Sequence, residues 1–270
     1  MYKVIIFLVL FYFKNLKKII ISKFVALMRI IKLNAIDSTN TYLKQICDGE
    51  MLKDYTIVIT KYQTHGRGQM GTVWSSEKAK NLMCSVFKEA SHISVDQQFY
   101  ISIVTSLAIV KALRSFNIPK LNVKWPNDIL SESKKVCGIL IENVIKNNKL
   151  EYSIIGIGLN VNQTEFKYLP NASSLKTLTG TVYNLDELLQ LILFNLRYYF
   201  KFLEQGKQEF LKKEYENLLF RKDKPSSFKD QKGNIFAGFI KGINAAGNLQ
   251  ILLEDDILKE YDLKEVQLLY

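Results

Sequence analysis

Apolar residues follow two different spacings along the chain, and each spacing predicts a different kind of element. Apolar positions three and four residues apart predict helices from Ser38 or Thr39 to about Cys47, over 99–116, from Asn184 to about Gln205, and again after Gly206. Short apolar runs predict strands at 29–33, 56–60, 83–87, 121–125, 136–144 and 152–161. The sequence therefore predicts an α+β (α/β) fold with a central mixed sheet flanked by helices. We expect this sheet to form the floor of a functional site.

The pattern changes near residue 221. Beyond this point, short strands are predicted at 236–240, 249–253 and 257–261, with Gly-Asn and Asp-Asp turns between them. We therefore expect a main domain over 28–220 and a small β-domain over 221–270.

The first 27 residues differ from both of these parts. Residues 4–13 are continuously apolar, but this run is shorter than the roughly 20 residues that cross a bilayer. The run is followed by lysines and not by the small residues of a signal-peptide cleavage site. We expect segment 1–27 to be untranslated, with translation starting at Met28, or disordered. An interfacial amphipathic helix is the alternative, and no stable membrane insertion is expected.

The segment Gln63–Trp74 carries the most chemical information. It places three glycines and Arg67 in one loop that ends on an indole ring. Glycines let backbone N–H groups approach a ligand closely, and a guanidinium pairs with carboxylate or phosphate. The pattern indicates a loop that closes over an anionic, nucleotide-like molecule. Dinucleotide-binding and kinase loops share this glycine spacing, but no helix is predicted to open after Gly71, and the other kinase motifs are missing.

Three further blocks accompany this loop. Ile36-Asp37-Ser38-Thr39-Asn40 precedes it, and Lys124-Trp125-Pro126-Asn127-Asp128 follows it. The third block combines Lys134-Lys135-Val136-Cys137-Gly138-Ile139-Leu140-Ile141-Glu142 with Ile155-Gly156-Ile157-Gly158-Leu159-Asn160. In this order and approximate spacing, the blocks resemble the biotin protein ligases over roughly residues 28–270. Because segment 1–27 is shorter than a winged helix-turn-helix, we expect the type without an N-terminal DNA-binding domain.

The resemblance implies a class II synthetase-like catalytic domain followed by an SH3-like barrel. It also implies a reaction in two steps. The carboxylate of biotin attacks the α-phosphate of ATP to give biotinyl-5′-AMP, and a lysine of a biotin carboxyl carrier protein then accepts the biotin. The implied ligands are biotin, ATP and Mg²⁺. We expect a cytoplasmic monomer or homodimer that does not bind specific DNA.

The roles of individual residues come from the same resemblance. Lys135 would bridge the biotin carboxylate and the α-phosphate, and Arg67 would hold that phosphate and fix the loop closed. Asp128 would take the proton of the incoming lysine, although a structural turn carboxylate is the alternative. The residues expected to bind biotin are Ser38, Thr39, Asn40, Gln63, Gly66, Arg67, Lys135 and Gly138.

Trp74 is expected to cover the adenine once the loop closes. The residues expected to bind ATP or the adenylate are Arg67, Gly68, Gln69, Trp74, Lys124, Asn127 and Asn160. No metal-binding motif is present in the sequence, so Mg²⁺ would arrive with ATP, near Asn160. The Gly156-x-Gly158 pair is expected to let the nucleotide lie close to a strand end. Because Gln69 and Thr72 stand where many relatives carry basic residues, we expect a weaker hold on the adenylate.

Charge and composition leave two alternative functions open. The formal net charge is +11, and Lys3, Lys14, Lys17, Lys18 and Lys23 supply nearly half of that excess. A basic nucleic-acid-binding protein would interleave aromatic residues with a basic cluster, whereas here they lie mainly in apolar runs. A lipoate–protein ligase would carry an Arg-Arg-x-x-Gly-Gly-Gly motif, which this chain lacks.

Cysteine and histidine add little further chemistry. Cys47, Cys84 and Cys137 form no Cys-x-x-Cys pair, which is typical of buried thiols in a reducing compartment. His65 lies inside the glycine loop without metal-ligand spacing, and we expect it to be only a loop residue.

Overall fold

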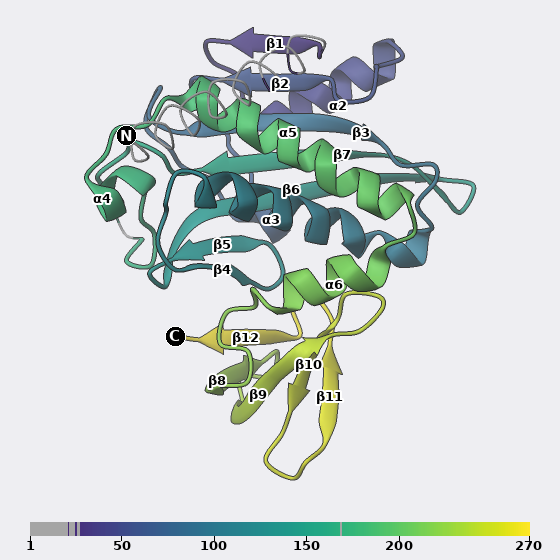
Figure 1. Ribbon diagram of the computed structural model, residues 1–270, viewed down its shortest axis with the longest axis vertical. Helices are drawn as coiled ribbons and strands as arrows, with labels where there is room; N and C mark the ends of the chain where they lie inside the picture. The colour runs from purple at the N-terminus through teal and green to yellow at the C-terminus, as the bar shows by residue number, and fades with distance from the viewer. Residues whose placement is uncertain (1–20, 22–24, 26–27, 168) are drawn as a thin grey trace, which may run out of the picture.

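The computed structural model describes Ile21, Val25, 28–167 and 169–270 of the chain. These residues form a seven-stranded sheet packed against helices and a separate five-stranded sheet near the C-terminus (Figure 1). The larger sheet is mixed, because β1 and β2 are parallel and the other neighbouring strands are antiparallel. In spatial order its strands are β1 (Ile30–Leu33), β2 (Ile57–Thr60), β3 (Leu82–Glu89), β7 (Lys149–Leu159), β6 (Lys134–Lys146), β5 (Asp128–Ser131) and β4 (Leu121–Lys124).

The predicted helices are confirmed. They are α2 (Thr39–Gly49), α3 (Phe99–Arg114), α5 (Leu185–Glu204) and α6 (Gln208–Glu216). The structure adds the short α4 (Leu175–Thr179) and two 3₁₀ turns, η1 (Gln69–Gly71) and η2 (Val95–Gln97). Ser38 is the N-cap of α2, since its hydroxyl accepts a hydrogen bond from the Thr41 N–H. Asn184 caps α5 by accepting from two backbone N–H groups of the first turn.

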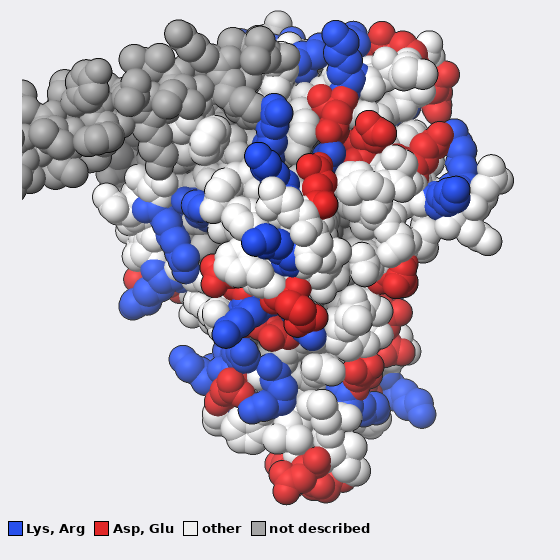
Figure 2. Space-filling model, turned by 45° about the vertical axis from the view of Figure 1, so that its right-hand side comes forward, with Lys and Arg blue, Asp and Glu red and all other residues white. Residues whose placement is uncertain are grey.

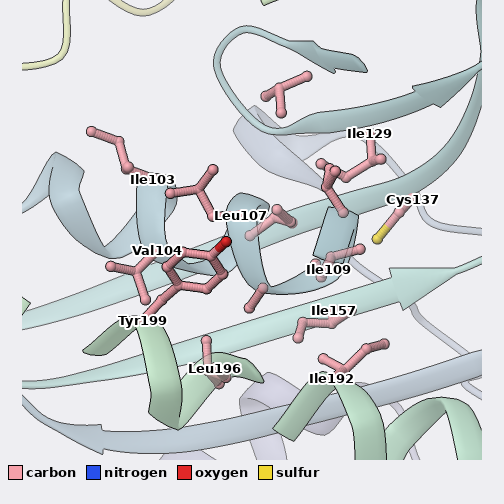
Figure 3. Close-up of a cluster of buried hydrophobic side chains, with 14 of the residues drawn as sticks. Ile103, Val104, Leu107, Ile109, Ile129, Cys137, Ile157, Ile192, Leu196 and Tyr199 are labelled. Atoms are coloured by element: carbon pink, nitrogen blue, oxygen red, sulfur yellow. The ribbon is translucent and has the colours of Figure 1, made fainter. Parts of the chain in front are cut away.

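Alternation along the central strands separates the hydrophobic core from the site. Ile155, Ile157 and Leu159 of β7 are buried in the main core with residues of α3 and α5, and Figure 3 shows Ile157 in that cluster. Successive side chains of a strand point to opposite faces, so Gly156 and Gly158 face the other side. That second face is the one on which α2 packs, above a small cluster that includes Leu43 and Ile154.

Two of the three cysteines belong to the main core. Cys84 and Cys137 are about 1% and 0% exposed, and neither forms a disulfide. Burial raises the pKa of the Cys84 thiol to about 12 and raises that of Cys137 as well. Both thiols therefore stay protonated and unreactive at neutral pH.

The five-stranded sheet has the order β11-β10-β9-β8-β12, and all of its neighbouring strands are antiparallel. Its strands are β8 (Pro225–Asp230), β9 (Ile235–Ile243), β10 (Leu249–Leu252), β11 (Leu258–Tyr261) and β12 (Val266–Leu269). Trp125 joins it to the larger sheet, because its indole Nε1 donates to the carbonyl of Gly247 at 2.9 Å.

Three strands were not predicted from the sequence, namely β5, β8 and β12. In β8 the first residues are Pro225, Ser226 and Ser227, which hide the apolar alternation.

At the other end of the chain, Ile21 and Val25 are helical and buried in the main core. The remaining residues of segment 1–27 lie outside the described part of the chain. Within the described part, no helix is both long and apolar enough to cross a membrane.

Candidate active site

Paired residues of three adjacent strands form the floor of the site, with two glycines on the central strand. Gly156 of β7 is paired with Ser85 of β3 on one side and with Leu140 of β6 on the other. Two residues along β7, Gly158 is paired in the same way with Met83 and Gly138. Residues two apart on a strand share a face, so these two rows lie side by side on the face that carries α2.

The side chain of Asn40 lies across the first row. Its Oδ1 accepts from the Ser85 hydroxyl at 2.6 Å, and its Nδ2 donates to the Leu140 carbonyl at 3.2 Å and to Glu142 Oε2 at 2.7 Å. A Cβ atom on Gly156 would stand only 2.5 Å from Asn40 Oδ1. The glycine is therefore needed so that this amide can lie flat on the sheet, and the amide is engaged by protein partners.

The indole of Trp74 lies across the second row. A Cβ atom on Gly158 would meet its ring at 2.6 Å, and one on Gly138 would meet it at 3.0 Å. The expectation that the nucleotide lies close to the strand end at Gly156 and Gly158 stays a prediction. The protein's own Asn40 and Trp74 occupy the space above them. The Trp74 Nε1–H is buried and has no hydrogen-bond partner among the described residues.

A cavity of about 570 Å³ lies above this floor and has a polar end. There, Gln63 Oε1 accepts hydrogen bonds from the backbone N–H of Thr39 at 2.8 Å and from its hydroxyl at 3.1 Å. The Ser85 hydroxyl lies 2.7 Å from Thr39 Oγ1 beneath them. This end offers amide and hydroxyl groups at fixed positions, which suits a small polar head group.

The glycine loop folds back on itself as a narrow hairpin over the cavity. The Trp74 N–H donates to the Gly66 carbonyl at 2.9 Å, and the Gly68 N–H donates to the Thr72 carbonyl at 2.7 Å. A Cβ atom on Gly66 would stand 2.3 Å from the Trp74 carbonyl oxygen, and one on Gly68 would stand 2.4 Å from Thr72 Oγ1. Neither position therefore has room for a side chain. His65 is exposed, and its ring contacts only the neighbouring Thr64 hydroxyl among the hydrogen bonds of the described residues.

Lys135 and Asp128 form an ion pair where the first cavity meets a second. Lys135 Nζ lies 2.6 Å from Asp128 Oδ1 and 5.7 Å from the centre of the Trp74 ring. The ion pair lacks the directional geometry of a hydrogen bond, so this buried carboxylate oxygen has no regular donor among the described residues. Lys135, Asp128 and Trp74 line both cavities. This ion pair therefore stands between the polar end of the first cavity and the whole of the second.

The second cavity, of about 630 Å³, is closed by the C-terminal strand. Gln267 to Tyr270 line it together with Lys124 and Asn160. Lys124 Nζ lies 4.8 Å from the centre of the Tyr270 ring. Burial lowers the pKa of Lys124, the charge of Lys135 acts in the same direction, and Asp128 opposes both. This cavity is a positively charged hollow with an aromatic edge, which suits a polyanion with a flat ring.

Arg67 pairs with a carboxylate in this structure. Its Nη2 lies 2.9 Å from Glu142 Oε1 and 2.8 Å from Oε2, and about half of the guanidinium side chain is exposed. The other predicted site residues gather as expected, because all of them except Gly66 line one of the two cavities. Gly66 takes part through its backbone, as the acceptor for Trp74.

The side-chain amides of Asn127 and Asn160 each donate a hydrogen bond to a backbone carbonyl of the protein. The Asn127 amide donates to the Ile139 carbonyl at 2.8 Å, and the Asn160 amide donates to the Ser173 carbonyl at 3.0 Å. These bonds use the nitrogen of each side chain, so its oxygen is the atom that remains to meet a nucleotide or its cation. Among the described residues, no group of three or more His, Cys, Asp or Glu side chains could hold a metal ion.

Sequence reasoning missed three contributors to the site. Ser85 interrupts an apolar strand and is fully buried, and a buried hydroxyl in such a run signals a polar partner. Glu142 belongs to a recognised block but had no assigned role. Gln267 lines both cavities and comes from the small C-terminal sheet, which no local motif could reveal.

The surface gives no support to nucleic-acid binding on the face seen in Figure 2. Basic and acidic side chains are interspersed there, and no broad area of one sign stands out. A nucleic-acid interface would require a continuous basic stripe.

Comparison with known proteins places these features in context. Residues 33–160 match the Biotin/lipoate A/B protein ligase family. The bifunctional ligase/repressor BirA of Escherichia coli is 31% identical over 239 residues, which cover 87% of this chain and 73% of that protein. The biotin–[acetyl-CoA-carboxylase] ligase of Mycobacterium tuberculosis is 30% identical over 45% of each chain.

A solved biotin protein ligase structure has a similar fold. The biotin protein ligase of Aquifex aeolicus, in complex with biotin and ATP, superimposes with a TM-score of 0.75 at 27% identity. The match covers 89% of this chain and 98% of that one. It therefore includes both the seven-stranded and the five-stranded sheet.

Proposed function

Because the chain belongs to the biotin protein ligases, we propose that its two cavities bind the two substrates of biotin activation. The first cavity binds biotin and the second binds ATP. The product is biotinyl-5′-AMP, from which a lysine of a biotin carboxyl carrier protein accepts the biotin. The observation that carries the assignment of the cavities is the position of Lys135 at their junction.

The first step brings a carboxylate up to a phosphate, so two anions must be held together. A biotin carboxylate oxygen attacks the α-phosphorus, the bond to the β-phosphate breaks, and pyrophosphate leaves. Lys135 contacts both anions from the junction and stabilises the charge that develops between them. Lys124 adds positive charge in the second cavity, and Thr39 and Gln63 fix the polar head of biotin at the far end of the first.

The second step needs a proton acceptor and a site that excludes water. The amine of the acceptor lysine attacks the carbonyl carbon of the mixed anhydride, and AMP leaves. Asp128 receives the proton of that amine, while its Oδ1 stays paired with Lys135 Nζ at 2.6 Å. Trp74 and the glycine loop cover the anhydride and protect it from hydrolysis.

We also propose that Mg²⁺ accompanies ATP. It would be bound largely by phosphate and water, as is usual for this ion, with the side-chain oxygens of Asn160 and Asp128 on the wall of the same cavity. Within this proposal the protein acts in the cytoplasm. The three unpaired cysteines support that location.

The proposal is tested by biotin-dependent exchange of labelled pyrophosphate into ATP. We expect exchange that requires biotin, is not supported by lipoate, and falls on the order of 100-fold or more in Lys135→Ala. Lys134→Ala is the matched control, because the adjacent Lys134 is directed to the Pro170 carbonyl at 2.8 Å and should retain activity. Folded wild-type protein without exchange would remove the proposed reaction.

A further inference from the structure

Arg67 is held in place by a network that reaches across three strands. The guanidinium extends from the glycine loop, and a single nitrogen, Nη2, contacts both oxygens of Glu142. The other guanidinium nitrogens contact no acceptor among the hydrogen bonds of the described residues. This arrangement fixes the position of the guanidinium and leaves donors for an incoming anion.

Glu142 is itself held by the sheet. It lies on β6 two residues from Leu140, on the face that carries the site, and its Oε2 accepts from Asn40 Nδ2 at 2.7 Å. Asn40 is fixed in turn by Ser85 on β3 and by the glycine beneath it. The carboxylate cannot easily follow the loop if the loop moves, because strands and a helix hold its partners.

From this geometry we propose that Glu142, supported by Asn40, is a positioning residue that orients Arg67 for the α-phosphate and keeps the glycine loop closed. The inference rests on the proposed function, because it takes that phosphate as the target of Arg67. Glu142 contacts no substrate in this scheme and acts only through the guanidinium. A carboxylate that orients an arginine reduces the conformational freedom that phosphate binding would otherwise have to remove.

The same network links the two ends of the site. The Ser85 hydroxyl has one proton and two acceptors at similar distances, Thr39 Oγ1 at 2.7 Å and Asn40 Oδ1 at 2.6 Å. A biotin head group that donates a hydrogen bond to Thr39 would satisfy that oxygen and leave the Ser85 proton to Asn40. Biotin in the first cavity would thereby strengthen the support of Glu142 and, through it, of Arg67.

The decisive experiment is a double-mutant cycle on pyrophosphate exchange. Glu142→Gln keeps the shape of the side chain and removes its charge. We expect kcat to fall about 10- to 100-fold, the range for loss of a hydrogen bond to a charged group, while the Kd for biotin stays within about threefold. In an Arg67→Ala background, Glu142→Gln should have no further effect. Glu151→Gln is the matched control, since its carboxylate pairs with Lys146 on the same hairpin at 2.8 Å, away from the cavities.

A second measurement tests the proposal without relying on activity. Amide hydrogen exchange in the ligand-free protein reports the closed loop through the Gly68 and Trp74 N–H groups, which are hydrogen-bonded within it. We expect these amides to exchange at least about tenfold faster in Glu142→Gln than in wild type or Glu151→Gln. Unchanged loop exchange, or an equal loss of kcat in the Arg67→Ala background, would overturn the positioning role. A wild type that lacks pyrophosphate exchange would refute the proposed function instead, and the hydrogen-exchange comparison would still decide whether Glu142 holds the loop.

Discussion

A methyl group added at Gly158 should displace Trp74 and leave the fold intact. The new Cβ would stand 2.6 Å from the indole Cε2 and 2.7 Å from Cζ2, whereas carbon atoms in good contact are about 3.5 Å apart. The ring must therefore move by about 0.9 Å, the difference between these distances. Because Trp74 belongs to a loop, this displacement should cost only about 1 kcal/mol of stability, the low end of the range for overpacking. A misplacement of that size can cost on the order of 100-fold in kcat.

The same substitution two residues away should behave differently. A Cβ on Gly156 would stand 2.5 Å from Asn40 Oδ1, and Asn40 belongs to a helix and is hydrogen-bonded on both sides. Since that amide cannot move aside, Gly156→Ala should cost about 1–3 kcal/mol, the usual cost of overpacking. Gly49→Ala, at a glycine whose Cβ would meet no atom within 4 Å, is the control for both.

Fluorescence and pyrophosphate exchange together measure the effect at Gly158. The chain has two tryptophans and 14 tyrosines, so in a Trp125→Phe parent, selective excitation of tryptophan makes Trp74 the only emitter. In that parent, Gly158→Ala should shift the emission to longer wavelength as the indole becomes more exposed, and urea unfolding should show a loss of only about 1 kcal/mol of stability. Unchanged emission with full exchange activity would refute the reasoning, because the indole would then not be lying on this glycine in solution.

Three further outcomes are expected. Gln69→Arg should slow release of the adenylate about 10- to 100-fold by adding a hydrogen bond to a charged group, and a release rate equal to wild type would refute this. Asp54→Ala should lower the free energy of unfolding in urea by about 1–3 kcal/mol, because Lys88 is about 3% exposed and lies 2.6 Å from that carboxylate, whereas Glu204 is farther away at 3.7 Å. An effect under about 1 kcal/mol would contradict it. Burial raises the pKa of Cys84 from 9.0 to about 12, so its contribution to stability is complete below pH 9 and is lost between about pH 9 and 12. Cys84→Ala should make the decline of the urea midpoint over that range less steep, and an identical decline would show that the thiol does not contribute.

The sequence was most informative where local rules decide the structure. The Ser38 cap, the apolar spacing of α3 and α5, and the strand runs of β3, β6 and β7 each depend on neighbouring residues. The motif residues also gathered in one place, because they lie at strand ends or in loops beside one sheet. For these features a local pattern was sufficient.

Pairing between distant residues could not be predicted in the same way. Which side chain lies over Gly156 depends on the register of β3, β7 and β6 and on the placement of α2, and none of these is encoded locally. The contributions of Glu142 and Gln267 were missed for the same reason. The β5 and β12 strands have only four residues each, so their periodicity is too short to identify them.

The two floor glycines have a consequence for how this sequence can change. Position 156 is the counterpart of position 40, and position 158 is the counterpart of position 74, although more than 80 residues separate the members of each pair. A larger residue at 156 would fit only beside a smaller one at 40, and that exchange would also remove the amide that supports Glu142. In a collection of functional variants, we therefore expect both members of each pair to be retained, so that a library randomised at either member would recover almost nothing but the starting residue.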